Sequence, residues 1–367
     1  MTLPRLRSLD LARGLTVAAM IVVNSPGRDE GYALLRHAPW NGLSGADFVF
    51  PAFLVVLGAA AAAKPAGGSW TRELKRAALL FGLGLLSNAF VADGPGGIRV
   101  LGVLQRIAFC SLGVAAALRS EVPAAAPCAA AALLLLHAAL LRFAPVPGAG
   151  AGGLAPFTNL SGWIDRAVLG GRVGEPWGDP EGLLSTLSAL ATALLGAWAG
   201  ARLRRDGPAG AARLAAAGAG LCAAGFAWSL VLPLNKRLWT GSYALATGGA
   251  CVALLAACAA AVDARAARWA RPVEALGRRA LSAYVLTGLA YGIQEYIPAT
   301  LPDGRAGNLK LLLTRELFEP WLSARPAAAA YAFAFAALAV AVANALQRGH
   351  GIPGVPEQTY EGRKEAL

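Results

Sequence analysis

Apolar segments, each close to the length that a helix needs to cross a lipid bilayer, follow one another along the chain. About 20 helical residues span the hydrocarbon core. The segments lie near residues 8–25, 43–63, 73–92, 98–118, 123–142, 181–201, 210–231, 239–262, 274–294 and 326–346. This pattern predicts an all-α fold, a polytopic membrane bundle of about 10 transmembrane helices. Segment 306–324 could add an eleventh, short or re-entrant helix.

Composition points the same way. Hydrophobic residues make up 56% of the 367 residues and charged residues only 15%, whereas soluble domains carry about 25% charged residues. A soluble protein of this size has no interior large enough to bury so much apolar surface. We expect one transmembrane domain over residues 1–348 and a polar, disordered cytoplasmic tail over residues 349–367. Asp10 and Arg13 interrupt the first segment, which therefore reads as a retained helix and not as a signal peptide.

The distribution of basic residues predicts the orientation of the helices. Lys and Arg are enriched in cytoplasmic loops, and an inside N-terminus puts most of the 33 basic residues in inner loops. The long segments 143–180 and 295–325 then lie outside, and both termini are cytoplasmic. Basic residues that mark cytoplasmic loops are a sufficient explanation for the net charge of +12. The basic residues form no dense run with interleaved aromatic residues, which a nucleic-acid partner would favour. We therefore predict no nucleic-acid partner.

Cysteine and histidine usage gives little support to a metal site. The five cysteines lie inside apolar segments without a C-x-x-C pair, as is typical of small buried hydrophobic residues. The chain has only three histidines, so we predict no metal ion. His137 lies in an apolar segment without polar company, which favours a packed side chain.

Polar residues inside apolar segments are informative because burying them costs free energy unless they find partners. Asp10 and Arg13 share one helical face at i,i+3 spacing, as either an ion pair that anchors the helix end or part of a site. Asn24 ends the same segment. Arg106, preceded by Gln105, must face a bundle interior or a wet cavity, and we favour contact with a ligand.

The densest polar cluster follows the first segment and contains His37, Trp40, Asn41 and Asp47. The predicted topology places it on the outer side, at the mouth of the second helix. A loop histidine is usually only solvated. In a chain with so few histidines, one beside an amide, a carboxylate and an indole is a candidate catalytic residue.

Two more polar segments lie on the outer side of later helices. One begins Asp179-Pro-Glu181, and the other contains Asn235-Lys236-Arg237-Leu-Trp239. Both are compatible with helix caps and aromatic anchors at the interface. Lys236 and Arg237 run against the positive-inside bias, which suggests a specific role for them.

The order of these motifs resembles the transmembrane heparan-α-glucosaminide N-acetyltransferases, and the chain is similar to a bacterial relative of that family over about residues 5–346. The motifs that carry the resemblance are Arg7-Ser-Leu-Asp10-x-x-Arg13-Gly14, His37-Ala-Pro-Trp-Asn-Gly-Leu-x-x-Ala-Asp47-x-Val-Phe-Pro51, Gly102-Val-Leu-Gln105-Arg106, Asp179-Pro-Glu-Gly-Leu-Leu-Ser-Thr and Pro233-Leu-Asn-Lys236-x-Leu-Trp239-Thr.

The resemblance implies an acetyltransferase that takes acetyl from cytoplasmic acetyl-CoA and passes it to the amine of a glucosamine-type sugar on the outer face. His37 matches the active-site histidine of the family, and Asn24 matches its partner asparagine. We expect His37 to act as general base, with Asn24 or Asn41 donating a hydrogen bond to the developing oxyanion. Asp47 would orient the imidazole. A covalent acetyl-His37 intermediate remains open.

Guanidinium groups suit the phosphates of CoA. The residues that we assign to the donor are Arg13, Arg106, Gln105, Asp10 and Arg279, the last standing where the family has an asparagine. The residues that we assign to the acceptor are Trp40, Asp179, Glu181, Asn235, Lys236 and Trp239. Segment 171–178 lacks the histidine of the family, and Ser188 replaces a proline, which leaves the identity of the acceptor open.

The expected partners are an amino sugar or cell-envelope glycan and the lipid bilayer of the bacterial cytoplasmic membrane, with a homodimer as an open option. Two other functions remain open. One is a membrane O-acyltransferase that acts on hydroxyl groups of envelope sugars. The other is a transporter of sugars or muropeptides, against which stands the lack of a visible inverted repeat.

Overall fold

The computed structural model describes residues 6–29, 31–64, 69–90, 97–120, 122, 124–265 and 267–349. Within these residues the fold is helical, with two small antiparallel ribbons, β1–β2 (Pro145–Val146 and Gly150–Ala151) and β3–β4 (Pro298–Thr300 and Ala306–Asn308). The predicted tail, apart from its first residue, lies outside the described residues, which end at position 349. Most of the transmembrane domain predicted for residues 1–348 is described.

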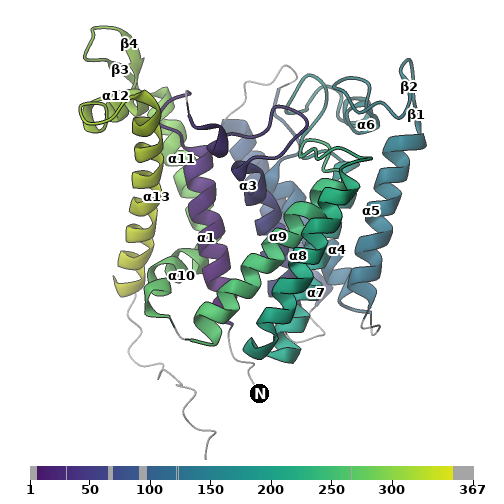
Figure 1. Ribbon diagram of the computed structural model, residues 1–367. Helices are drawn as coiled ribbons and strands as arrows, with labels where there is room; N and C mark the ends of the chain where they lie inside the picture. The colour runs from purple at the N-terminus through teal and green to yellow at the C-terminus, as the bar shows by residue number, and fades with distance from the viewer. Residues whose placement is uncertain are drawn as a thin grey trace, which may run out of the picture.

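A helix lies in every segment that the sequence predicts to cross the membrane, and successive helices run in opposite directions (Figure 1). These helices are α1 (Arg7–Asn24), α2 (Val49–Ala62), α3 (Trp70–Phe90), α4 (Val103–Ala117), α5 (Ala125–Phe143), α7 (Ser185–Asp206), α8 (Ala211–Trp228), α9 (Gly241–Cys258), α11 (Ala280–Tyr296) and α13 (Ala324–Gly349). The all-α class is therefore confirmed.

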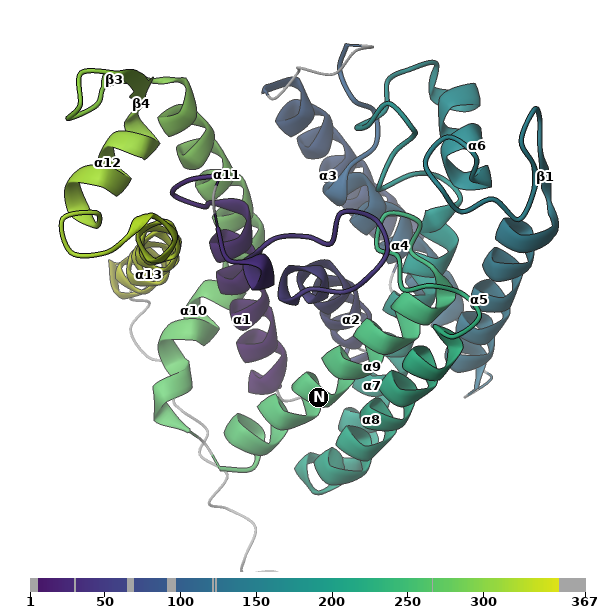
Figure 2. The same ribbon diagram turned by 45° about the horizontal axis from the view of Figure 1, so that its top comes forward.

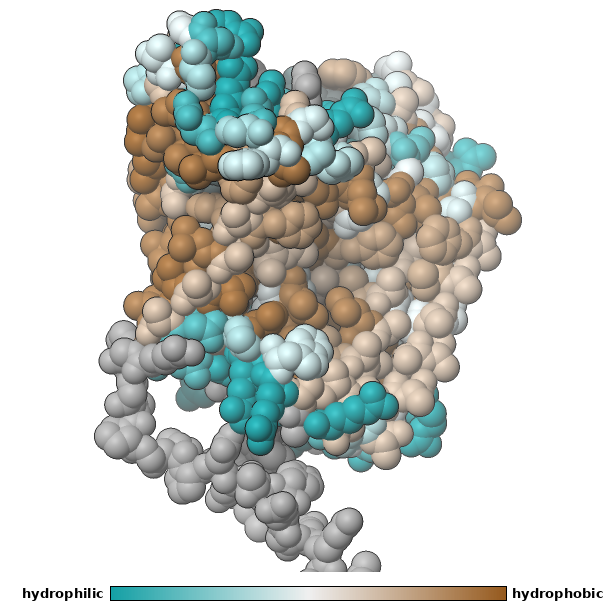
Figure 3. Space-filling view, turned by 60° about the vertical axis from the view of Figure 1, so that its left-hand side comes forward, coloured by the Kyte–Doolittle hydropathy of each residue, from teal (hydrophilic) through white to brown (hydrophobic). Residues whose placement is uncertain are grey.

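Five helices in the described part of the chain are long and apolar enough to cross a membrane. They cover Gly45–Ala62, Ala125–Phe143, Pro208–Trp228, Gly241–Asp263 and Ala324–Gln347. The predicted number of about ten is not confirmed, because several other helices carry charges within their bounds, as α1 does at Arg7, Asp10 and Arg13. Figure 3 shows an apolar band between two polar ends, as expected of a membrane protein.

The segment 306–324 does not form an additional crossing. It contains β4 and the short helix α12 (Leu309–Leu317), whose nine residues rise by about 14 Å. That is roughly half of the hydrocarbon thickness. The Asn308 side chain caps α12 by accepting a hydrogen bond from the Leu311 amide at 2.9 Å.

The long connections gather at one end of the bundle, which we call the loop end. It carries residues 25–48, the ribbon β1–β2 with α6 (Leu160–Leu169), residues 229–240 and the segment from β3 to α12 (Figure 1). The opposite end, which we call the basic end, carries the start of α1 and the helix α10 (Arg271–Arg278). Seen from above, the connection between α1 and α2 passes over the middle of the bundle (Figure 2).

Small residues allow α2 and α7 to pack closely along one another. A Cβ added at Gly58 would lie 1.8 Å from the Ala193 carbonyl oxygen, and one at Gly196 would lie 2.1 Å from that of Val55. Ordinary side chains cannot enter this contact because the neighbouring atoms belong to the backbone. The contact fixes α2, which contributes residues to the walls of both cavities described below.

Replacing Gly58 with alanine should therefore destabilise the bundle by about 1–3 kcal/mol, the usual cost of overpacking. Thermal unfolding in detergent measures this effect. Gly220→Ala on α8 is the matched control, since a Cβ there meets nothing within 4 Å and alanine favours the helix. Equal melting temperatures for the two variants would contradict the role of the α2–α7 contact.

Candidate functional site

His37 and Asn24 line the same cavity at the loop end, although one lies in a connection and the other ends α1. The cavity has a volume of about 260 Å³. Phe50 and Phe53 form part of its apolar wall. Its charged wall residues, besides His37, are Glu175, Glu181, Lys236 and Arg237.

The imidazole of His37 is held by Asp47. His37 Nδ1 lies 2.9 Å from Asp47 Oδ1, and the Asp47 side chain is fully buried. The other carboxylate oxygen accepts hydrogen bonds from the amides of Ala38 at 3.2 Å and Ser44 at 3.0 Å. Since Asp47 accepts at Nδ1, the proton of a neutral imidazole belongs on Nδ1. The Nε2 lone pair is then available as a base.

Lys236 reaches the same imidazole from the connection between α8 and α9. Its Nζ lies 2.9 Å from His37 Nδ1, 3.1 Å from His37 Nε2 and 3.7 Å from Asp47 Oδ1. Burial lowers the pKa of Lys236, and the charges of Asp47 and Glu181 partly offset that shift. The sequence predicts Lys236 as an acceptor contact; the structure brings it directly onto the candidate base.

Asn235 holds the Lys236 connection against the His37 connection. Its Nδ2 donates to Asn41 Oδ1 at 3.0 Å, and its Oδ1 accepts from the Leu238 amide at 2.8 Å. Asn41 is not among the residues that line the described cavity. The structure therefore gives Asn41 and Asn235 a bridging position, and of the two predicted oxyanion donors only Asn24 lies at the cavity.

Trp40 also lies outside the cavity wall. Its indole Nε1 donates to the Leu154 carbonyl at 3.0 Å, and its ring meets Trp177 edge-on at 4.9 Å between centroids. Trp40 thus attaches the His37 connection to the segment that leads to α6. Its predicted contact with the acceptor stays a prediction.

Arg99 was not anticipated as a site residue, yet it organises the acidic motif. Its Nε donates to Asp179 Oδ2 at 2.8 Å, its Nη2 donates to Asp179 Oδ1 at 2.5 Å, and Nη2 also pairs with Glu181. Asp179 is buried beneath Arg99, while Glu181 reaches the cavity wall. The sequence shows that Arg99, Asp179 and Glu181 are charged, but it does not show that they form ion pairs with one another.

Asp165 on α6 also holds the segment that contains Asp179 and Glu181. It accepts hydrogen bonds from the backbone amides of Asp179 at 3.2 Å and Leu183 at 2.9 Å. Burial raises the pKa of Asp165 to about 6. Asp179 and Glu181 are therefore set in place from two sides before the chain enters α7.

Arg106, Gln105 and Trp239 lie in the packed interior. Arg106 donates to the Gly182 carbonyl at 3.3 Å and to Ser185 Oγ, and its guanidinium carbon lies 5.0 Å from the centroid of the Trp239 ring. None of the three lines either described cavity. The Arg106 side chain, from α4, thus reaches the start of α7, while its Nε and Nη1 are buried without a hydrogen-bond partner among the described residues; its predicted contact with the donor stays a prediction. The sequence could not separate this position from a ligand contact.

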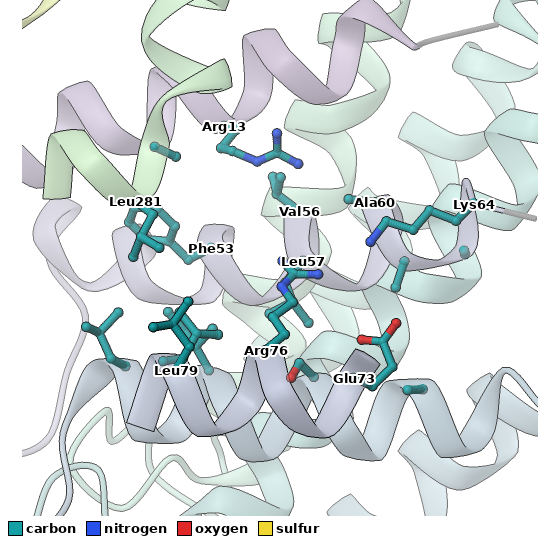
Figure 4. Close-up of a pocket in the computed structure, with 18 of the residues that line it drawn as sticks. Arg13, Phe53, Val56, Leu57, Ala60, Lys64, Glu73, Arg76, Leu79 and Leu281 are labelled. Atoms are coloured by element: carbon teal, nitrogen blue, oxygen red, sulfur yellow. The ribbon is translucent and has the colours of Figure 1, made fainter. Parts of the chain in front are cut away.

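A larger cavity of about 1000 Å³ opens towards the basic end. Glu73 is its acidic wall residue, and its basic wall residues are Arg13, Lys64, Arg72, Arg76, Arg119, Arg204 and Arg278. Figure 4 shows Arg13 of α1 and Arg76 of α3 reaching into it from different helices, with Phe53, Leu79 and Leu281 gathered further along. Burial and the charge of Arg76 lower the pKa of Lys64.

The two cavities adjoin. Phe53, Val103 and Tyr284 line both of them. The basic cavity and the cavity that contains His37 thus share three wall residues. Of the predicted donor residues, the structure brings Arg13 to the larger cavity.

Asp10 and Arg279 lie near the larger cavity without lining it. Asp10 is buried and pairs with Arg13 at 3.4 Å, as the i,i+3 spacing predicts. Arg279 donates to the Leu346 carbonyl at 3.4 Å, whereas its neighbour Arg278 lines the cavity. The predicted donor contact of Arg279 stays a prediction.

Comparison with known proteins bears on the same residues. Residues 5–155 match the family described as "Heparan-alpha-glucosaminide N-acetyltransferase, catalytic". The chain is 29% identical over 307 residues to the heparan-α-glucosaminide N-acetyltransferase of Mus musculus, an alignment that covers 65% of this chain and 46% of the relative. It is 31% identical over 255 residues to that of Homo sapiens, covering 54% and 38%.

These comparisons support the family that the motifs indicate. The chain spans less than half of the length of these two relatives. The family match covers His37, Asn24, Asp47 and Arg13, whereas Lys236 lies beyond its end. The relatives are N-acetyltransferases by name, which supports an enzyme of that class.

Arg99→Met should lower the free energy of unfolding by about 3–5 kcal/mol, because it removes the charged partner of the buried Asp179 carboxylate. Thermal or denaturant unfolding in detergent measures the loss. Arg305→Met is the matched control, since Arg305 pairs with Asp303 in an exposed position and such pairs contribute about 0–1 kcal/mol. Similar losses for both variants would contradict the anchoring role of Arg99.

Proposed function

We propose that the chain transfers acetyl from acetyl-CoA, which enters at the basic end, to the amine of a glucosamine-type sugar at the loop end. The observation that carries this proposal is the pair of adjoining cavities, one with a basic mouth and the other with His37 and Asn24 in its wall. The names of the relatives support the acetyl transfer and the sugar class.

The larger cavity suits the donor in charge and shape. CoA carries several phosphates at one end, and guanidinium groups bind phosphate through paired hydrogen bonds. Arg13, Arg72 and Arg76 supply such groups near the opening. The deeper wall is apolar, as the uncharged arm of CoA requires. The cavity volume of about 1000 Å³ is at the upper end for small-molecule sites.

The smaller cavity suits a cationic acceptor. A sugar amine is protonated near neutral pH and is attracted to carboxylates. Glu181 and Glu175 lie in the cavity wall, where they pair with Arg99 and Arg237, and the acceptor ammonium would share these carboxylates with the arginines. To become a nucleophile, the amine must lose its proton. His37 Nε2 is the base closest to this task because Asp47 already holds Nδ1.

The reaction then follows from these positions. His37 takes the proton from the acceptor, and the amine attacks the thioester carbonyl. The Asn24 amide donates a hydrogen bond to the oxyanion. The C–S bond breaks as the C–N bond is completed, and the leaving thiolate takes a proton. A route through acetyl-His37 would use the same Nε2 as nucleophile.

The same arrangement supports the predicted orientation. Basic residues mark cytoplasmic loops, and the mouth of the donor cavity is basic. We place the basic end and both termini in the cytoplasm and the loop end outside, in the cytoplasmic membrane of a bacterium. A donor made in the cytoplasm and an acceptor outside it would then meet between the two cavities.

Transfer of labelled acetyl from acetyl-CoA to a panel of amino sugars tests the function directly. His37→Ala should lower the rate by about 10²- to 10⁴-fold, the usual contribution of a general base, while the Kd for acetyl-CoA stays unchanged. An alkali-stable product identifies an amide. An alkali-labile ester would overturn the amine acceptor, and wild-type rates in His37→Ala would remove His37 from the chemistry.

Arg76→Ala should raise the Kd for acetyl-CoA roughly tenfold, about 1.4 kcal/mol, with a larger effect at low ionic strength. Equilibrium binding at two salt concentrations measures this change. Arg213→Ala is the matched control, because Arg213 lies near the start of α8 with a side chain that is 77% exposed and does not line the cavity. Equal Kd values for the Arg76 and Arg213 variants would remove the basic mouth from donor binding.

A further inference from the structure

The ammonium group of Lys236 occupies the space beside the candidate base. Its Nζ lies 2.9 Å from His37 Nδ1 and 3.1 Å from His37 Nε2, which places it over the imidazole and not on the line of the Nε2 lone pair. A general base works on a proton whose heavy atom lies about 2.6–3.2 Å away, and rotation of the Lys236 side chain would bring Nζ onto that line. The acceptor amine needs the same place, so Lys236 either moves aside for the sugar or takes its place in the reaction.

The backbone of Lys236 is held on both sides, so its position beside His37 follows from the local fold. The Trp239 amide donates to the Lys236 carbonyl at 3.0 Å, and the Thr240 amide donates to the Asn235 carbonyl at 3.1 Å. Asn235 is hydrogen-bonded to Asn41 in the His37 connection. The ammonium can therefore move only by rotation of the long side chain. Glu181, which lines the same cavity, offers a carboxylate toward which it can turn.

We propose that Lys236 is a self-acetylation site, the protein's own amine standing in for the acceptor when no sugar is bound. The proposal rests on the acetyl transfer proposed above. His37 removes a proton from the Lys236 ammonium, and the neutral amine attacks the thioester carbonyl. The C–N bond of acetyl-lysine forms, the C–S bond breaks, and the thiolate leaves with a proton.

The surroundings of Lys236 favour this reaction over that of an ordinary surface lysine. The side chain is 18% exposed, and burial lowers the pKa of Lys236, which increases the share of neutral amine. The charged groups around it are Asp47, Glu175, Glu181 and Arg237. Acetylation would leave a neutral amide beside His37, so the modified enzyme should accept sugars poorly.

The test uses the full-length chain, purified in detergent and incubated with acetyl-CoA without any acceptor. Peptide mass spectrometry then follows acetylation of Lys236 and of two comparison lysines. Lys310 is a buried amine at the loop end that pairs with Glu295 at 2.9 Å. Lys75 is exposed on α3 and reports non-enzymatic acetylation. We expect Lys236 to react at least tenfold faster than either, and glucosamine to protect it.

The outcomes separate this inference from the function that it rests on. If glucosamine is acetylated and Lys236 never is, the inference is overturned and the proposed function stands. If neither is acetylated, both are overturned. Acetylation of Lys236 at the same rate in His37→Ala would overturn the inference, because the reaction would not need the base. Stable acetyl-lysine without any transfer to glucosamine supports the inference and overturns the choice of acceptor.

Loss of activity gives a second measurement. Incubating the wild-type chain with acetyl-CoA before adding glucosamine should inactivate it progressively. Lys236→Arg keeps the positive charge but cannot be acetylated, because a guanidinium does not lose its proton in proteins. Whatever activity Lys236→Arg retains should therefore survive the incubation. Inactivation of Lys236→Arg at the wild-type rate would contradict the inference.

Discussion

The buried carboxylate of Asp47 connects nearly every part of the site. It accepts from His37 and from the amides of Ala38 and Ser44, and the Tyr243 hydroxyl donates to the Asp47 backbone carbonyl at 2.6 Å. A buried carboxylate is costly unless it is hydrogen-bonded on several sides. The chain meets this requirement by folding the His37 connection over the start of α2. The orientation of the imidazole is thus a consequence of satisfying Asp47.

Charge and cavity shape divide the molecule between its two ends. The larger cavity has basic side chains from α1, α3, α7 and α10 near its mouth, and the smaller one has acids and bases around a single imidazole. Because each set comes from several helices, neither can be assembled by one segment alone. The close glycine contact between α2 and α7 keeps Phe53 of α2 in place as a wall of both cavities.

The sequence predicts the helices well because apolar length and loop charge are local properties. It also singles out His37, Asn24 and Arg13, which the structure places in cavity walls, and Asp47, which contacts His37. Their roles stay predictions. It cannot predict that Lys236 meets His37 across 199 positions, since that contact depends on the packing of distant helices.

Arg106 shows the limit most clearly. A charged residue within a helix needs a polar neighbour, but the sequence does not say whether that neighbour is protein or ligand. The structure pairs it with Gly182 and Ser185 at the start of α7. Arg99, which does organise the acidic motif, lies at the very start of the predicted segment 98–118 and looks like an ordinary charge at a helix end.

The three side chains shared by the cavities have a consequence for the membrane itself. A continuous column of water from one face to the other would let protons and ions leak down their gradients. Phe53 and Val103 carry no group that can pass a proton, and Tyr284 carries only one hydroxyl. In the proposed transfer, these side chains would keep water from forming a continuous column while the acetyl group passes from one cavity to the other.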